Sequence, residues 1–381
     1  MTTPRASVRR APILVALVLT ALAAAAAPRV AREMPDFEVY YRAGTRARHA
    51  EGLYRAEDGH YQHKYLPVFA VVAAPLTFLP LRTAKVVWFF ASVAALGLLV
   101  AASLALLPAP RVRPWVLATL TTMAMAKFFA HELTLGQCNS FLALCVVAAM
   151  ASLRRKRQAR AGGWIAASAV VKPYTLVLLP YLFVTRRWRA LAAGALAVAA
   201  ALVIPAAIYG FGGNLRQLGD WLATITETTA PNLLNQDNVS VWAMYAKWFG
   251  IGRLAGFLAI GTIAGLFGLV AALVREGPGL ARPEYLEIAA LMLLVPLLSP
   301  QGWDYGLLAG TPAVMLFLDR FRDLPRPVRL VGGAGVAVMS LSIFDLMGRA
   351  AYARFMATSA VTVCALVLLG TLAVMRARRL A

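Results

Sequence analysis

The sequence predicts an all-α protein that crosses a membrane many times. Of its 381 residues, 60% are hydrophobic and 14% are charged, and a water-soluble fold of this length cannot bury so much apolar surface. The apolar residues form runs of about 20, the length of a helix that crosses a hydrocarbon core of about 30 Å. Ala, Leu, Val and Gly dominate these runs, which favours helices over the strands of a membrane barrel.

The basic residues orient these helices. The net charge of +21 would also suit a nucleic-acid-binding protein, but no interleaving of aromatic and basic residues accompanies it. The cations instead gather in short segments between apolar runs, as in the cytoplasmic loops of membrane proteins. These segments are residues 5–10, 111–113, 154–160, 186–189, 320–329 and 376–379.

The chain is expected to start in the cytoplasm and to cross outward at residues 11–27. A cleaved signal peptide is the alternative, since small residues end this run, but the many later helices favour its retention. Residues 28–85 then form an outer loop. Within it, residues 66–81 are apolar but carry three prolines, which break helices and indicate a short embedded hairpin.

The remaining path alternates regularly across the membrane. Residues 162–184 lie between two basic segments and are interrupted at Lys172-Pro173, so a broken-helix hairpin with two cytoplasmic ends is expected there. About ten full spans, cytoplasmic termini and one multi-span domain over residues 1–381 follow, with further outer loops at 210–253 and 299–305. After the first span, the expected full spans are 86–107, 115–130, 140–153, 190–209, 254–274, 286–298, 306–318, 330–344 and 356–375.

Several catalytic and metal-binding motifs are missing from the sequence. Cys138, Cys145 and Cys364 lie in or beside apolar runs without metal-ligand spacing, so neither a disulfide framework nor a zinc site is predicted. No phosphate-binding glycine loop, nucleophile elbow or HExxH motif is present, which disfavours a nucleotide-driven cytoplasmic reaction.

The polar clusters fall on the outer face in this topology. Five segments, at residues 34–41, 60–65, 127–139, 232–240 and 299–305, converge there and suggest a cavity lining. Asp36 stands a few residues past the first span among aromatic residues. A carboxylate at such a low-dielectric boundary can hold a raised pKa and accept a proton from a hydroxyl group; the alternative is an ordinary solvated acid beside the membrane.

Positive charge on these segments suits a phosphate group. Lys172 draws most interest, because a cation at the tip of a broken helix is costly unless it is paired or hydrated. The alternative for each cation is extension toward the lipid headgroups. The candidates are Lys64, Lys127, His131 and Lys172.

Uncharged polar side chains on the same face suit sugar hydroxyls, because amides offer paired donors and acceptors. They can equally cap helices and close turns, as Asn139 would before a helical run. Trp303 and Asp304 end a span on the outer side, where they are either site residues or interface anchors. The amide candidates are Gln137, Asn139, Asn235 and Gln236.

The order of these motifs resembles glycosyltransferase family 87, the bacterial polyprenyl-phosphate-mannose-dependent α-(1-2)-mannosyltransferase-like proteins. The resemblance spans residues from about 10 to 320, and its specificity lies in the order of short pieces. These pieces are Asp36-Phe37 with Tyr40-Tyr41, Gly52-Leu53-Tyr54, Tyr65-Leu66-Pro67, Gly136-Gln137 with Asn139, Lys172-Pro173, Arg186-Arg187-Trp188, Asn235-Gln236 with Ser240, and Ser299-Pro300 with Trp303-Asp304.

The resemblance implies a GT-C-type fold that moves a sugar from a lipid-phosphate donor to a glycan or glycolipid at the outer face of the cell membrane. It implies Asp36 as general base for inverting transfer, with Lys172 and Lys64 near the departing phosphate. Tyr40, Tyr41 and Tyr65 join the acceptor or sugar contacts. The donor carries its own leaving group, so no nucleotide, metal or other cofactor is expected, and no nucleic-acid partner.

One departure from the family pattern puts the acceptor or phosphate contacts in doubt. Relatives often have histidine after the Ser-Pro-x-x-Trp motif, where this chain has Asp304-Tyr305. Mannose is the family default, and a pentose remains open. Two other functions compete: a transporter or flippase of a lipid-linked or small polar substrate, which would use broken helices, and a non-catalytic assembly factor.

Overall fold

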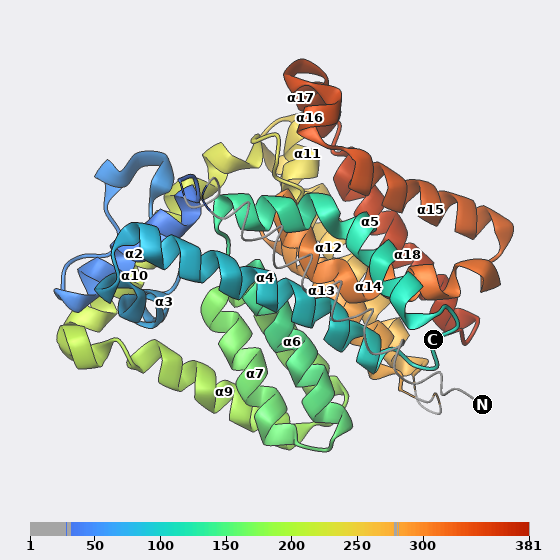
Figure 1. Cartoon of the computed structure of the whole chain (residues 1–381), viewed down its shortest axis with the longest axis horizontal. Coiled ribbons are helices and arrows are strands. Elements are labelled where there is room, and N and C mark those ends of the chain that lie inside the picture. The colour runs from blue at the N-terminus through green and yellow to red at the C-terminus, as the bar shows by residue number, and fades with distance from the viewer. Residues whose placement is uncertain (1–27, 29–31, 278–279, 281, 381) are drawn as a thin grey trace, which may run out of the picture.

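Helices form the regular elements of the computed structural model (Figure 1). The structure describes residues 28, 32–277, 280 and 282–380, and the predicted first span at residues 11–27 lies outside them. Among the described residues, strand-like pairing is limited to an isolated bridge between Asn238 and Trp303. The predicted all-α class is confirmed.

The elements follow one another with short connections. The first part of the chain contains α2 (Pro35–Arg48), η1 (Ala56–Tyr61), α3 (Pro67–Ala73), η2 (Ala74–Phe78), α4 (Leu81–Leu106), α5 (Pro114–Leu135), α6 (Asn139–Arg154), α7 (Gln158–Val171), η3 (Pro173–Val177), α8 (Leu178–Val184) and α9 (Trp188–Val203). The second part contains α10 (Ala206–Leu233), α11 (Val241–Phe249), α12 (Arg253–Arg275), α13 (Glu284–Leu298), η4 (Asp304–Gly310), α14 (Thr311–Arg320), η5 (Phe321–Asp323), α15 (Arg326–Leu341), α16 (Phe344–Met347), α17 (Arg349–Ala357) and α18 (Ala360–Ala377).

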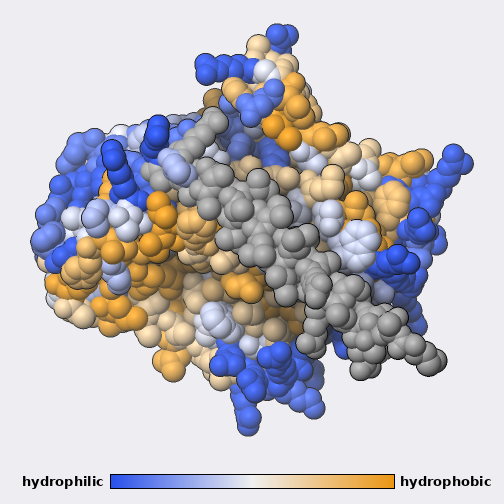
Figure 2. All heavy atoms as spheres, in the orientation of Figure 1, coloured by the Kyte–Doolittle hydropathy of each residue, from blue (hydrophilic) through white to orange (hydrophobic). Residues whose placement is uncertain are grey.

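Three of these helices, α4, α12 and α18, are long and apolar enough to span a membrane. A fourth candidate is the bent pair α9 and α10, and shorter apolar helices cover Pro67–Phe78, Asn139–Arg154 and Pro173–Val184. Figure 2 shows hydrophobic surface between hydrophilic groups at the ends of the molecule. The structure therefore contains three to four candidate membrane spans, whereas the count of about ten full spans stays a prediction.

The structure breaks the helical hairpin where the sequence predicted it. Helix α7 ends at Val171, and Lys172 is extended with φ −145° and ψ 119°. Proline disfavours the helical conformation of the residue before it, so Pro173 places the break at Lys172. Pro173 then opens η3, and α8 returns toward the basic segment at residues 186–189.

Helix α10 differs from the expected outer loop at residues 210–253. Helix α9 ends at Val203, earlier than the predicted span to residue 209, and the chain turns by 89° into α10. Pro205 lies in this turn, and Gly210 adopts φ 68°. Helix α10 exposes apolar side chains such as Phe211 and Leu222, at 69% and 60%, while it buries the polar side chains Asn214, Gln217 and Thr224.

Helices α7 and α9 approach each other backbone to backbone. A Cβ atom added at Gly162 would lie 2.2 Å from the Ala190 carbonyl oxygen and 2.6 Å from the Gly194 nitrogen. Such a distance is far inside van der Waals contact, so the helices would have to separate. Gly162 thus fixes the spacing of this helix pair.

We expect Gly162→Ala to lower the stability of the protein by about 1–3 kcal/mol, because the added methyl group overpacks the α7–α9 contact. The midpoint of thermal unfolding in detergent measures this effect. Gly163→Ala is the matched control, since a Cβ atom there meets nothing within 4 Å and alanine favours the helix. Equal midpoints for the two variants would contradict the contact.

Candidate active site

Asp36 lies in the first turn of α2, against the end of α5. The amide of Met34 donates to the Thr134 carbonyl at 3.2 Å. Gly136 ends α5 with φ 72°, and a Cβ atom on it would lie 2.8 Å from the Phe37 Cβ. Glycine at this position therefore lets the start of α2 pack onto the α5–α6 turn and brings Asp36 beside Gln137.

The side-chain amide of Gln137 links Asp36 to two other predicted site residues, Tyr40 and Tyr65, and also to Tyr305. Its Nε2 donates to the Asp36 Oδ2 at 2.6 Å and to the Tyr305 hydroxyl at 3.1 Å. Its Oε1 accepts from the Tyr40 and Tyr65 hydroxyls at 3.3 and 3.4 Å. Because donors surround the oxygen, the NH₂ group is held toward the carboxylate.

Glu132 supports this amide from the buried side and was not singled out from the sequence. Its Oε2 accepts from the Asn139 Nδ2 at 2.8 Å, and its Oε1 accepts from the Ser140 amide at 2.6 Å. Asn139 in turn donates to the Gln137 Oε1 at 3.3 Å. A carboxylate just past an apolar run was the available signal, because such acids are rare unless functional or paired.

The surroundings of Asp36 suit a proton acceptor. Burial raises the pKa of Asp36, and the Gln137 hydrogen bond and the charges of Lys172, His60 and Lys64 oppose that rise. Burial also lowers the pKa of Lys64, against the pull of Asp36. The Lys172 Nζ lies 5.5 Å from the centre of the Tyr305 ring. Two of the predicted phosphate-binding cations therefore act on the predicted base.

Removing the Gln137 amide is expected to move the acidic limb of the pH–rate profile. The hydrogen bond favours the ionised carboxylate, so Gln137→Leu raises the pKa of Asp36 further. Because a general base acts in its ionised form, activity is lost as pH falls, and the limb moves to higher pH in the variant. Rates of sugar transfer across a pH series measure the shift. An identical limb in both proteins would exclude Gln137 as the partner of the base.

Asp304 anchors a second cluster with two of the other predicted cations. The Lys127 Nζ lies 3.2 Å and the His131 Nδ1 3.3 Å from the Asp304 Oδ2. The side chains of Lys127 and Asp304 are each 2% exposed, and Lys127 also donates to the Ser342 Oγ at 3.1 Å. Both cations are thus directed at Asp304, and their expected role toward a phosphate stays a prediction.

The segments around residues 232–240 and 299–305 join through their backbones. The Val239 amide donates to the Gly302 carbonyl at 2.6 Å, and the Asp304 amide donates to the Asp237 carbonyl at 3.0 Å. Trp303 stacks near Tyr305, with 6.5 Å between ring centres. This pairing brings Trp303 and Asp304 to the site, as the predicted convergence requires.

Three of the predicted contacts serve local structure or face outward. The Asn235 Oδ1 accepts from the Asp237 amide at 3.0 Å. This bond closes a turn, which was the alternative role predicted for the amide side chains. The side chain of Gln236 is exposed. The Tyr41 hydroxyl donates to the Leu79 carbonyl at 2.9 Å, away from Asp36. Their sugar-binding roles remain predictions.

Asp237 is a further acid that sequence reasoning missed. It accepts from the Tyr352 hydroxyl at 2.9 Å. Burial, and then the negative charge of Asp304, raise the pKa of Asp237. Neighbouring Lys247 donates to the Gln236 and Asn238 carbonyls, and burial lowers its pKa to about 8. Only tertiary packing brings these groups together, so the sequence held no signal for them.

The described residues contain no group of three or more His, Cys, Asp or Glu side chains arranged to hold a metal ion. The expectation of a metal-independent reaction is untested. The polar groups gathered around Asp36 and Asp304 are hydrogen-bond donors, carboxylates and ammonium groups, which suit a phosphate and sugar hydroxyls.

Comparison with models of known protein families assigns the chain to one of them. The model of glycosyltransferase family 87 matches residues 63–300, more than half of the sequence. Searches among curated proteins and among solved structures found no match. The match begins after Asp36, so the case for that residue rests on its contacts with Gln137 and the nearby cations. The chain belongs to glycosyltransferase family 87.

Proposed function

We propose that this glycosyltransferase moves a sugar, with mannose as the first candidate, from a polyprenyl-phosphate donor to a glycan or glycolipid acceptor at the outer face of the cell membrane. Family membership implies a sugar donor and an acceptor. The observation that carries the finer proposal is the Asp36 carboxylate, held at 2.6 Å by Gln137 and within the field of Lys172 and Lys64.

In this proposal Asp36 acts as general base. It takes the proton of an acceptor hydroxyl, the hydroxyl oxygen attacks the anomeric carbon, and the bond from that carbon to the phosphate oxygen breaks. Polyprenyl phosphate leaves with the bonding electrons, and the configuration inverts. Partial burial raises the pKa of Asp36, which makes the carboxylate a better proton acceptor. Lys172 and Lys64 stabilise the charge that develops on the phosphate.

The proposed topology has both termini in the cytoplasm, about ten full spans in one domain and the site outside. Helix α7 supports it. Its first residue, Gln158, lies within the basic segment at residues 154–160, and its last residue precedes Lys172, whose charge acts on Asp36. Fourteen helical residues separate these groups by about 20 Å. The site around Asp36 and the basic turn before α7 therefore lie at opposite ends of this helix, far apart along the proposed membrane normal.

Purified full-length protein in lipid vesicles, supplied with polyprenyl-phosphate mannose and a glycolipid extract, tests the donor class. A new glycosidic product, detected by mass spectrometry and formed without added nucleotide, is the expected result. Nucleotide-activated mannose as the only donor is the control and is expected to give no product. Product from the nucleotide sugar alone would overturn the lipid-phosphate donor.

A transporter or flippase is the second candidate, favoured by the helix break at Lys172. The same vesicles distinguish the two functions. Movement of the lipid-linked sugar across the bilayer without any glycosidic product would replace the enzymatic proposal.

A further inference from the structure

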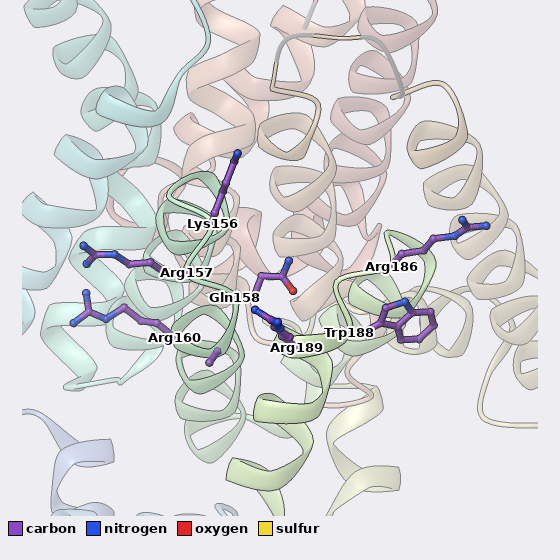
Figure 3. A pocket seen from close by; sticks show the side chains of 8 residues that line it. Lys156, Arg157, Gln158, Arg160, Arg186, Trp188 and Arg189 are labelled. Carbon is purple, nitrogen blue, oxygen red and sulfur yellow. The ribbon is translucent and has the colours of Figure 1, made fainter.

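Two basic turns lie side by side at the end of α7 away from Asp36. One joins α6 to α7, and the other joins α8 to α9. A hollow of about 680 Å³ lies between them. Figure 3 shows Arg157 and Arg160 on one side of the view and Arg186 on the other, with Arg189 between them. Five cations, Lys156, Arg157, Arg160, Arg186 and Arg189, line this hollow, together with Trp188.

These five cations lack acidic partners among the described residues. Each is exposed, and none takes part in an ion pair within the part of the chain that the structure describes. Nearby cations behave differently: Arg154 pairs with Glu284 at 2.9 Å, and Arg376 pairs with Glu287 at 3.1 Å. The hollow therefore concentrates positive charge that an anion would neutralise.

The backbone holds two of the cations in fixed and unfavourable conformations. Lys156 and Arg186 adopt the left-handed conformation with φ 57° and 56°. In both turns the next amide bonds back over five residues, from Arg157 to the Ser152 carbonyl and from Arg187 to the Leu182 carbonyl, each at 2.8 Å. Glycine is usual at this position of a helix end, because a side chain there is strained.

The two turns are also fixed relative to each other. Gly162, in the second turn of α7, lies against the Ala190 carbonyl at the start of α9. This backbone contact sets the distance between the two basic turns, so the cations surround a preformed hollow.

An apolar margin adjoins the hollow. Trp188 is 51% exposed and Phe183 is 58% exposed, and their rings meet edge to face with 5.1 Å between centres. Aromatic side chains of this kind lie at the level of lipid headgroups. A small soluble anion would use the cations and leave these rings in water, whereas a lipid would cover both.

We propose that this hollow binds the phosphodiester headgroup of an anionic phospholipid from the leaflet at this end of the molecule, with an acyl chain against Phe183 and Trp188. Basic pockets between membrane helices bind anionic headgroups through such clusters. The inference concerns a surface remote from Asp36, and it stands whether or not the donor proposed above is correct.

Native mass spectrometry of the full-length protein, titrated with phosphatidylglycerol or phosphatidylcholine in detergent, tests the proposal. The wild-type protein is expected to retain phosphatidylglycerol in preference to phosphatidylcholine. The variant R157Q/R160Q/R186Q/R189Q is expected to bind it at least about tenfold more weakly, given the contribution of each cation near a lipid surface. If the quadruple variant fails to fold, the pairs R157Q/R160Q and R186Q/R189Q replace it, and each is expected to bind more weakly.

The control variant R322Q/R326Q/R378Q/R379Q removes four exposed arginines that do not line the hollow, and it is expected to bind like the wild type. Equal losses in both quadruple variants would reduce the effect to overall charge and overturn the site, as would unchanged binding in the hollow variant. Displacement of the lipid by millimolar glycerol phosphate would indicate a site for a soluble phosphate and would also overturn the lipid assignment.

Glycine at the two left-handed positions separates binding from folding. Lys156→Gly with Arg186→Gly is expected to raise the midpoint of thermal unfolding while it lowers lipid retention. Arg379→Gly is the matched control, because Arg379 has φ 54° in the same kind of turn but lies outside the hollow. It is expected to raise the midpoint and leave retention unchanged. Loss of retention in the control would contradict the site.

Discussion

Sugar transfer falls by a factor of at least about 10² when Asp36 is replaced with asparagine, which is the scale of a lost general base. Asparagine matches the shape of the carboxylate and can still accept the hydrogen bond from the Gln137 Nε2, but it cannot take up the acceptor proton. Folding is therefore expected to survive. Initial rates of transfer from the lipid-phosphate donor, together with gel filtration of the variant, measure the two effects.

Glu57→Gln is the matched control for that substitution. Glu57 is an exposed acid in η1, on the segment that follows α2, and it is expected to be replaceable with little loss of activity. Wild-type turnover by Asp36→Asn would remove the proposed mechanism while leaving family membership intact.

The free energy of unfolding is expected to fall by about 3 kcal/mol when Lys127 is replaced with methionine. The substitution leaves the buried Asp304 carboxylate without its nearest cation. Both side chains of the Lys127–Asp304 pair are 2% exposed. His131 keeps part of the compensation at 3.3 Å, which places the loss at the lower end of the range for broken buried pairs. Thermal or denaturant unfolding of the protein in detergent micelles measures it.

The double variant Lys127→Met/Asp304→Asn is expected to recover most of this loss, because it removes the uncompensated charge as well. Arg55→Met provides a surface comparison. Its partner Glu51 lies 2.5 Å away, but the two side chains are 35% and 47% exposed, so a change below about 1 kcal/mol is expected. Similar losses for Arg55→Met and Lys127→Met would show that burial does not set the strength of the internal pair.

The helical architecture was predictable because a bilayer imposes helix length and backbone pairing on the sequence. Helices α4, α12 and α18 coincide with long apolar runs. The break at Lys172 follows from a local steric rule at Pro173. By contrast, the span predicted at residues 190–209 is shorter in the structure, because the chain turns by 89° between α9 and α10. The apolar run continues through Pro205, so hydrophobicity alone does not reveal where the helix changes direction.

The site was predictable in outline and not in detail. The predicted convergence of the polar segments anticipated the contact between Asp36 and Gln137, which lie far apart in the chain. Which cation meets which acid depends on tertiary packing: Lys127 and His131 turned out to contact Asp304. Asp237 was overlooked because its partner Tyr352 becomes a neighbour only in the fold. Glu132 carried a signal, as an acid just past an apolar run, but its contact with Asn139 is visible only in the structure.

The reversed polarity of α10 bears on how a long-chain substrate arrives. Helix α10 exposes the apolar side chains of Phe211 and Leu222 to its surroundings. It directs the polar side chains of Asn214 and Gln217 into the protein, where they form hydrogen bonds. The amide of Gln217 accepts from the Leu53 amide at 3.1 Å, within the segment that follows α2. The Asn214 side chain likewise donates to the Leu202 carbonyl at 2.8 Å, so these amides fasten α10 to its neighbours. The polyprenyl-phosphate donor proposed above would meet the apolar outer face of α10 first, so we expect it to approach the protein from the bilayer.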